Sequence, residues 1–180
     1  LTGYRLVVVP MLYLLTDAFA KKLCDFAQSG GTIVVTYWTG VVDESDLCRL
    51  GDTPYGLTEL LGLRRTEIDG MYDGETRRCT PVDGCTLPET QASILCEVAV
   101  PNDNDPAKPL CVYAEDYFAQ HPAAAVHKYG AGRAYYLASR FDEDFYRTFY
   151  RDAAKELGLT PAWPQPLPAG VLAVKRGNFV

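Results

Sequence analysis

The first forty residues follow two kinds of hydrophobic pattern. A continuous apolar, β-branched run at Tyr4–Pro10 predicts a fully buried strand, and Thr32–Tyr37 predicts a second one. Between them, apolar residues recur at helical spacing over residues 19–27, and Gly30 follows in the usual place for a helix end. A strand, a helix and a strand in this order predict a βαβ unit with parallel strands.

The C-terminal third is patterned almost as clearly. Ala123–Tyr129 and Arg133–Ser139 are strand-like runs around a short, glycine-containing turn, which indicates a β-hairpin. Acidic residues then open a helix, whose apolar face runs from Phe145 to Leu157. Pro161–Pro168 is rich in proline and predicts a stiff, extended linker.

The middle of the chain has weaker patterns. A short helix is expected after Thr53-Pro54, with Pro54 in its first turn and Gly62 at its end. Asp73–Thr90 has little periodicity, and we interpret it as irregular. The remaining strand-like runs are Arg65–Asp69, Ser93–Val100 and Leu110–Tyr113.

These elements predict a single α/β domain over residues 1–160. We expect a three-layer sandwich with a mostly parallel sheet, helices on both faces and an added antiparallel hairpin. A chain of 180 residues is the right size for one such domain. Val171–Val174 has the pattern of a strand that belongs to a following module.

Charge and cysteine usage narrow the possible partners. The net charge is −6 and no long cationic cluster occurs, so we expect neither nucleic acid nor an anionic membrane as a partner. The apolar runs are far shorter than a membrane span. Six cysteines without any CxxC spacing, and only two histidines, predict no metal site. They favour a reduced chain in the cytoplasm.

Sequence motifs for catalysis are missing. No glycine-flanked Cys or Ser elbow occurs, and neither His121 nor His127 is followed by an acid two positions later. The loop after the first strand lacks the glycines of a nucleotide site. No Asn-Glu pair of the kind that marks many glycosidase acids occurs. We therefore expect no catalytic, cofactor-binding or metal-binding residue in this chain.

One segment stands out as a candidate contact surface. The acid-rich loop 38–51 follows the second parallel strand, at the sheet edge where ligands and partners gather. Three roles are open for its acids: they bind a partner, they hold a cation or a sugar, or they cap turns. Two roles are open for its aromatic neighbours, which either contact a partner or cover the sheet's own edge. The candidate interface residues are Tyr37, Trp38, Asp43, Glu44, Asp46 and Tyr55.

Several stretches resemble the middle domain of family 42 β-galactosidases. The most specific is Tyr37–Asp46 (YWTGVVDESD), followed by Cys48–Gly51 (CRLG) and Pro54–Gly62 (PYGLTELLG). Pro122–Ser139 (PAAAVHKYGAGRAYYLAS) has the same character, and the resemblance extends from about residue 1 to 159. Residues 70–108 do not follow the pattern, which leaves their role open.

The resemblance implies an α/β sandwich similar to class I glutamine amidotransferases or flavodoxin, without the amidotransferase nucleophile. Such a domain follows a catalytic barrel, precedes a small C-terminal β domain and supplies much of the contact in a homotrimer. Residues 161–180 then form the linker and the start of that β domain. The chain begins at Leu1 inside a structured segment, so we expect a piece of a longer protein.

The resemblance also implies which part of the parent protein carries out catalysis and which part makes contacts. The parent protein is expected to be a retaining β-galactosidase acting on terminal β-D-galactosides, with both catalytic glutamates in the barrel. This chain is expected to use no cofactor, to contact its own barrel and neighbouring subunits, and to meet galactoside only through the parent. Two alternatives remain open: a standalone module that binds a sugar or another small molecule, and a divergent amidotransferase-like hydrolase.

Overall fold

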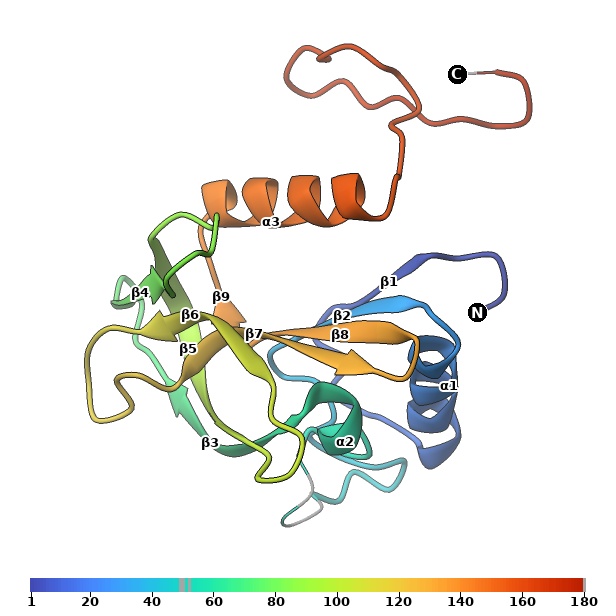
Figure 1. Cartoon of the computed structure of the whole chain (residues 1–180). Helices are drawn as coiled ribbons and strands as arrows, with labels where there is room; N and C mark the ends of the chain where they lie inside the picture. Colours follow the sequence, from blue (N-terminus) through green and yellow to red (C-terminus); the bar gives the residue numbers. More distant parts are fainter. Residues whose placement is uncertain (49–50, 52, 180) are drawn as a thin grey trace.

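In the part of the chain that the structure describes, a mixed nine-stranded sheet runs through the molecule, and three helices pack against it (Figure 1). The computed structural model describes residues 1–48, 51 and 53–179. Within these residues the elements are β1 (Leu6–Val9), α1 (Asp17–Gln28), β2 (Thr32–Thr36), α2 (Thr58–Leu61), β3 (Leu63–Gly70), β4 (Thr76–Pro81), β5 (Thr90–Pro101), β6 (Lys108–Tyr113), β7 (Pro122–Tyr129), β8 (Gly132–Leu137), β9 (Ser139–Arg140) and α3 (Glu143–Glu156).

The strand order is β1-β2-β8-β7-β6-β4-β5-β3, and β9 pairs with β5. Only β1–β2 and β2–β8 are parallel among the described strands, whereas every other pairing is antiparallel. The prediction of a mostly parallel sheet is therefore wrong. The strands from β3 to β8 follow one another through turns, and only a parallel neighbour needs a crossover helix. The predicted hairpin is confirmed as β7–β8.

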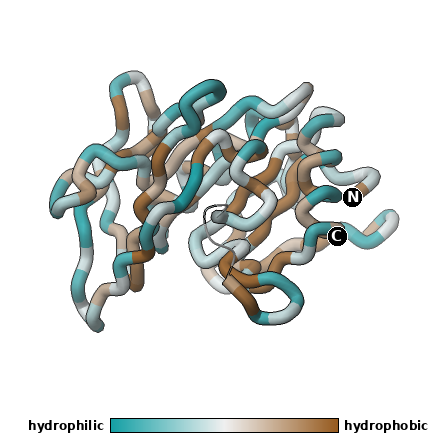
Figure 2. Tube along the Cα trace, turned by 90° about the horizontal axis from the view of Figure 1, so that it is seen from below, coloured by the Kyte–Doolittle hydropathy of each residue, from teal (hydrophilic) through white to brown (hydrophobic). Residues whose placement is uncertain are grey.

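Side chains of β2 alternate between two hydrophobic clusters. Ile33 and Val35 pack with residues of α1 and α2, whereas Val34 packs with Phe145 and Phe149 of α3. Figure 1 shows α3 above the sheet, with α1 and α2 below it. In Figure 2 the hydrophobic colour follows the strands and the hydrophilic colour gathers on the outer loops. None of the helices in the described ranges is long and apolar enough to cross a lipid bilayer.

Two strands differ from their predictions. The first run forms β1, but β1 lies at the sheet edge, and Val9 alone among its four residues is buried. A continuous apolar run does not by itself separate an edge strand from a central one. The segment interpreted as irregular contains β4, in which only Cys79 is buried. With one buried residue, β4 carries almost no periodic signal in the sequence.

Helix α2 is shorter than predicted. It starts at Thr58, and the preceding Thr53-Pro54 lies in a turn rather than in the first helical turn. In that turn the Leu57 N–H donates to the Pro54 carbonyl at 3.0 Å. The predicted end is confirmed, because Gly62 adopts a left-handed conformation with φ of +63° as the C-cap.

Gly132 allows α1 to approach the sheet closely. A Cβ atom at this position would lie 2.1 Å from the Gly31 carbonyl oxygen and 2.4 Å from that of Ala27. Both neighbours are backbone atoms, which cannot rotate away. Glycine at the start of β8 is therefore required by the packing of α1 against the sheet.

Beyond α3 the chain leaves the sheet. Residues 161–179, which we call the arm, project past the end of α3 in Figure 1. Within the arm one isolated bridge joins Arg176 to Phe179. Leu172 is 90% exposed and Phe179 is 81% exposed, so large apolar side chains of the arm have little contact with the rest of the domain.

Candidate functional site

Two loops lie side by side at the carboxyl ends of β1 and β2. Backbone hydrogen bonds join residues 11–15 to residues 38–47: Gly40 N donates to Leu12 O at 2.9 Å, and Leu15 N donates to Val42 O at 3.0 Å. We call the exposed side chains of residues 11–14 and 38–47 the paired-loop surface. Its place at the carboxyl edge of parallel strands is the one predicted for the acid-rich loop.

The paired-loop surface combines apolar and acidic groups. The rings of Tyr13 and Trp38 stack with centroids 6.4 Å apart, and Trp38 is 37% exposed. Glu44 and Asp46 are also exposed, and within the described residues their side chains make no hydrogen bond or ion pair. The exposed large apolar side chains are Met11, Tyr13, Leu14, Trp38 and Leu47. Clustered aromatic and apolar area is a common feature of protein interfaces.

The six predicted interface residues divide into two groups. Trp38, Glu44 and Asp46 are exposed, and Asp43 is half-buried. Tyr37 and Tyr55 are only 7% and 4% exposed, so their side chains are not available to a partner and instead cover the domain's own core. The backbone of Tyr37 continues the hydrogen-bonded pairing of β2, and its side chain is buried like those of β2.

Asp43 has a structural task in its loop. Its Oδ1 atom accepts hydrogen bonds from the backbone N–H groups of Ser45, at 2.8 Å, and Leu47, at 3.1 Å. This is the turn-capping alternative considered for the loop acids. Across the residues that the structure describes, no three His, Cys, Asp or Glu side chains gather in a way that would hold a metal ion. Part of the Cys48–Gly51 motif, residues 49 and 50, lies outside the described residues.

A buried carboxylate supports the paired-loop surface from inside. Glu97 of β5 is fully buried, and its Oε1 atom accepts from the Trp38 N–H at 2.9 Å and from Arg65 Nη1 at 2.8 Å. Its Oε2 atom accepts from the Tyr136 hydroxyl. Arg65 Nη1 also donates to the Thr39 carbonyl at 3.2 Å. An ion pair from β5 and β3 thus anchors the backbone beneath the exposed tryptophan.

Burial dominates the electrostatics of this carboxylate. It raises the pKa of Glu97 above its ordinary value, although the Arg65 guanidinium and the donors Tyr136 and Trp38 N–H act in the opposite direction. Trp38 has a φ of +60°, a conformation that non-glycine residues seldom adopt without support. The hydrogen bond to Glu97 supplies that support. Sequence reasoning missed Glu97, although a single acid inside the apolar strand Ser93–Val100 was a usable signal.

Three of the six cysteines have the features of structural thiols. All six are free, and Cys79, Cys96 and Cys111 are fully buried. Burial raises the pKa of Cys96 to about 11, so this thiol is protonated at neutral pH. The Nδ1 atoms of His121 and His127 lie 3.1 and 3.0 Å from backbone carbonyls rather than beside a thiol. This chemistry suits packing rather than nucleophilic attack.

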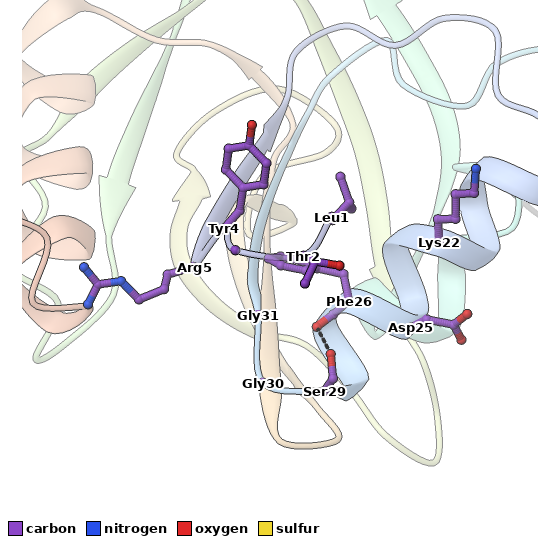
Figure 3. Close-up of a pocket in the computed structure, with 11 residues that line it drawn as sticks. Leu1, Thr2, Tyr4, Arg5, Lys22, Asp25, Phe26, Ser29, Gly30 and Gly31 are labelled. Carbon is purple, nitrogen blue, oxygen red and sulfur yellow. Dashed lines mark hydrogen bonds between the residues drawn. The ribbon is translucent and has the colours of Figure 1, made fainter. Parts of the chain in front are cut away.

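A cavity of about 520 Å³ lies between the N-terminal segment and the end of α1 (Figure 3). Its polar side chains do not converge: Ser29 donates to the Phe26 carbonyl at 3.0 Å, and Asp25 forms an ion pair with Lys21 at 2.7 Å. Arg5 points away from the cavity and donates to the Leu157 carbonyl at 2.8 Å. The cavity therefore does not have the convergent groups of a catalytic site.

Comparison with known proteins shows the family of the chain. The family described as the β-galactosidase trimerisation domain matches residues 1–160. The chain belongs to this family. As a trimerisation domain it is 42% identical, over 99% of its length, to a β-galactosidase of Alicyclobacillus acidocaldarius, of which it covers 26%.

Solved structures give the same result. The trimerisation domain superposes on a β-galactosidase from Rahnella sp. R3 with a TM-score of 0.90 and 40% identity, covering 98% of this chain and 26% of that one. A β-galactosidase from Bacillus circulans sp. alkalophilus gives a TM-score of 0.84 and 30% identity over 91% of this chain and 24% of the other. The chain therefore spans about a quarter of the length of these relatives.

Proposed function

We propose that this chain is the non-catalytic oligomerisation domain of a β-galactosidase that hydrolyses terminal β-D-galactosides. The family match over residues 1–160 carries the proposal. The relatives of which the chain spans a quarter are themselves named β-galactosidases, which supports catalysis in an upstream barrel. The buried thiols, and a cavity whose polar side chains do not converge, fit a domain that mediates contacts rather than catalysis.

The proposed partners are the domain's own barrel and neighbouring subunits of a homotrimer. Within this proposal Trp38, Glu44 and Asp46 of the paired-loop surface contact a partner, and Asp43 holds their loop in shape. Nucleic acid and membranes are not proposed as partners, because the chain is acidic. Residues 1–160 form the domain and residues 161–180 lead into a C-terminal β domain.

Two finer assignments belong to the same proposal. The parallel strands β1, β2 and β8, with α1 and α2 packed against one cluster and α3 against the other, support a three-layer sandwich of the amidotransferase or flavodoxin kind. In this view β3 to β6 extend that core as an antiparallel addition. The six free thiols favour a reducing compartment, and the cytoplasm is the proposed location.

Sedimentation analysis of the purified chain tests the oligomerisation proposal. We expect a species of three times 19.9 kDa and no turnover of nitrophenyl β-galactosides. The double variant Trp38→Ala/Asp43→Ala is expected to shift the chain toward monomer with its circular dichroism spectrum unchanged. A matched control, Tyr72→Ala/Asp73→Ala, removes an exposed aromatic and an exposed acid elsewhere and should remain trimeric. A wild-type chain that stays monomeric at high micromolar concentration would contradict the proposal.

A further inference from the structure

A cavity of about 490 Å³ lies where β6 begins beside the β7–β8 hairpin. We call it the lysine cavity, and all of its lining residues fall between Asp105 and Arg133. Its charged lining side chains are Lys108, Lys128, Arg133 and one acid, Asp105, whereas the whole chain has a net charge of −6. The lysine cavity is therefore a positively charged site on an acidic protein.

The strand register places these cations on one face of the sheet. Lys128 of β7 lies directly opposite Arg133 of β8, and Lys108 of β6 lies opposite Val126, two residues before Lys128. Opposite residues and residues two apart share a face, so three like charges lie over three neighbouring strands. Like charges in such positions destabilise a sheet unless an anion compensates them.

Of the three cations, only Arg133 has a compensating anion among the described residues. Its guanidinium pairs with the Glu156 carboxylate at the end of α3. Lys108 and Lys128 are exposed and make no hydrogen bond or ion pair with any described residue. Two unpaired ammonium groups beside a cavity suit an oxyanion such as phosphate, because each supplies both a full charge and strong donors.

The other face of β7 contributes acceptors to the same cavity. The side chain of His127 is 3% exposed, and its Nδ1 atom lies 3.0 Å from the Leu60 carbonyl oxygen. Because a carbonyl oxygen only accepts, Nδ1 carries the proton of the neutral ring and Nε2 holds a lone pair. This Nε2 atom is buried without a hydrogen-bond partner among the described residues, and it lies 3.2 Å from Oδ2 of Asp105.

The two acceptors fit hydroxyl groups. A lone pair and a carboxylate 3.2 Å apart repel each other unless donors reach them, and neighbouring hydroxyls of a sugar or polyol supply one donor to each. The Asp105 side chain is 78% exposed, so it is free to turn toward a ligand. Its charge also opposes a second anionic group on that side, which favours a phosphate monoester over a polycarboxylate.

We propose that the lysine cavity binds a phosphorylated sugar or polyol. The phosphate lies between Lys108 and Lys128, and the hydroxyls donate to Asp105 and His127. A cavity of this volume has room for a hexose phosphate. The lysine cavity contains no residue of the paired-loop surface, so this is a second function of the domain and does not depend on the proposed oligomerisation.

Isothermal titration calorimetry of the chain at low salt tests the site with glucose 6-phosphate, inorganic phosphate and glucose. We expect glucose 6-phosphate to bind about tenfold more tightly than inorganic phosphate, because only the sugar phosphate satisfies both acceptors. Glucose, which lacks the charged group, should bind most weakly.

Removing the lysines tests the anionic half of the site. Lys108→Ala/Lys128→Ala is expected to weaken the binding of both phosphates by about tenfold or more, because charge-assisted hydrogen bonds are lost. Lys22→Ala/Lys175→Ala is the control, because it removes the same charge at exposed positions on α1 and beyond α3, and it should leave both affinities unchanged.

Asp105→Ala tests the hydroxyl half of the site. It should weaken glucose 6-phosphate by roughly threefold or more, while inorganic phosphate binds as tightly as before or more tightly, because a nearby anion is gone. The circular dichroism spectrum should be unchanged in every variant, since the replaced side chains are exposed. Absence of binding by both phosphates at millimolar concentration, equal affinity for the two phosphates, or equal loss in the lysine variant and its control would each overturn the proposal.

Discussion

At the scale of single residues, Glu97 has the largest consequence. It is fully buried, and its carboxylate receives hydrogen bonds from β3, from β8 and from the loop that carries Trp38. A buried ion pair of this kind adds little net stability compared with apolar residues of equal size. Its value lies in orientation, because it fixes the backbone beneath the paired-loop surface.

Replacing only one member of this pair should be costly. Glu97→Gln leaves the Arg65 guanidinium buried without its counter-charge, and we expect the free energy of unfolding to fall by about 3–5 kcal/mol in urea titration. The double variant Arg65→Met/Glu97→Met removes both charges and should be more stable than the single variant. Asp25→Asn, which breaks the exposed pair with Lys21, is the control and should leave the free energy of unfolding nearly unchanged. Equal losses for all three variants would contradict the assigned role of Glu97.

At the scale of elements, Asp142 joins α3 to the sheet. Its Oδ1 atom accepts from the Phe145 N–H at 3.0 Å and caps the helix. Its Oδ2 atom accepts from the Thr90 hydroxyl at 2.7 Å and from the Gln91 N–H at 3.2 Å, both on β5. One carboxylate therefore sets both the start of α3 and its attachment.

Asp142→Ala should destabilise the domain by about 1–2 kcal/mol at neutral pH, because a helix cap and a link to β5 are lost together. Burial opposes ionisation of Asp142, but the hydrogen bonds from Thr90, Phe145 and Gln91 outweigh it and lower its pKa below 3.8. The stabilisation by the Asp142 carboxylate is thus complete above the pKa that Asp142 has in the unfolded chain. It disappears as the pH falls through the lower pKa that Asp142 has in the folded chain.

Urea titrations of wild type and Asp142→Ala at pH 7 and pH 3 measure this difference. The gap in unfolding free energy should be smaller at pH 3. Asp144→Ala is the matched control, since it removes an acid from the same helical turn without removing the cap. A gap that widens in acid would show that the carboxylate does not act in its ionised form.

The sequence predicted the elements that have strong local periodicity. The α1–β2 segment, the β7–β8 hairpin and α3 follow from apolar spacing and glycine positions that need no knowledge of distant neighbours. Strand β4 was missed because one buried cysteine leaves no pattern. The antiparallel half of the sheet was missed because strand direction depends on which strands become neighbours, which local spacing does not encode. The candidate interface loop was proposed from its composition and position, but the inward direction of Tyr37 and Tyr55 depends on packing.

At the scale of the whole molecule, association and stability are linked. Partner subunits that bind only the folded chain stabilise it by mass action, so the Tm of a trimer depends on protein concentration. We expect the Tm of the wild-type chain to rise by about 2–4 °C for each tenfold increase in concentration.

Differential scanning calorimetry over a hundredfold concentration range checks this expectation. Trp38→Ala/Asp43→Ala should flatten the dependence, because it disrupts the proposed contact surface, whereas the Tyr72→Ala/Asp73→Ala control should keep it. A wild-type Tm that does not change with concentration would argue against subunit association at the temperatures of unfolding.

The β2–β8 pairing affects the order in which the domain can fold during translation. It joins Thr32 to Arg133, so β2 can pair with β8 only after most of the chain has been synthesised and has left the ribosome. Until then an apolar strand has one open edge, which is exposed to pairing with other chains. Slowing synthesis between β2 and β7 should therefore lengthen the period in which nascent chains aggregate.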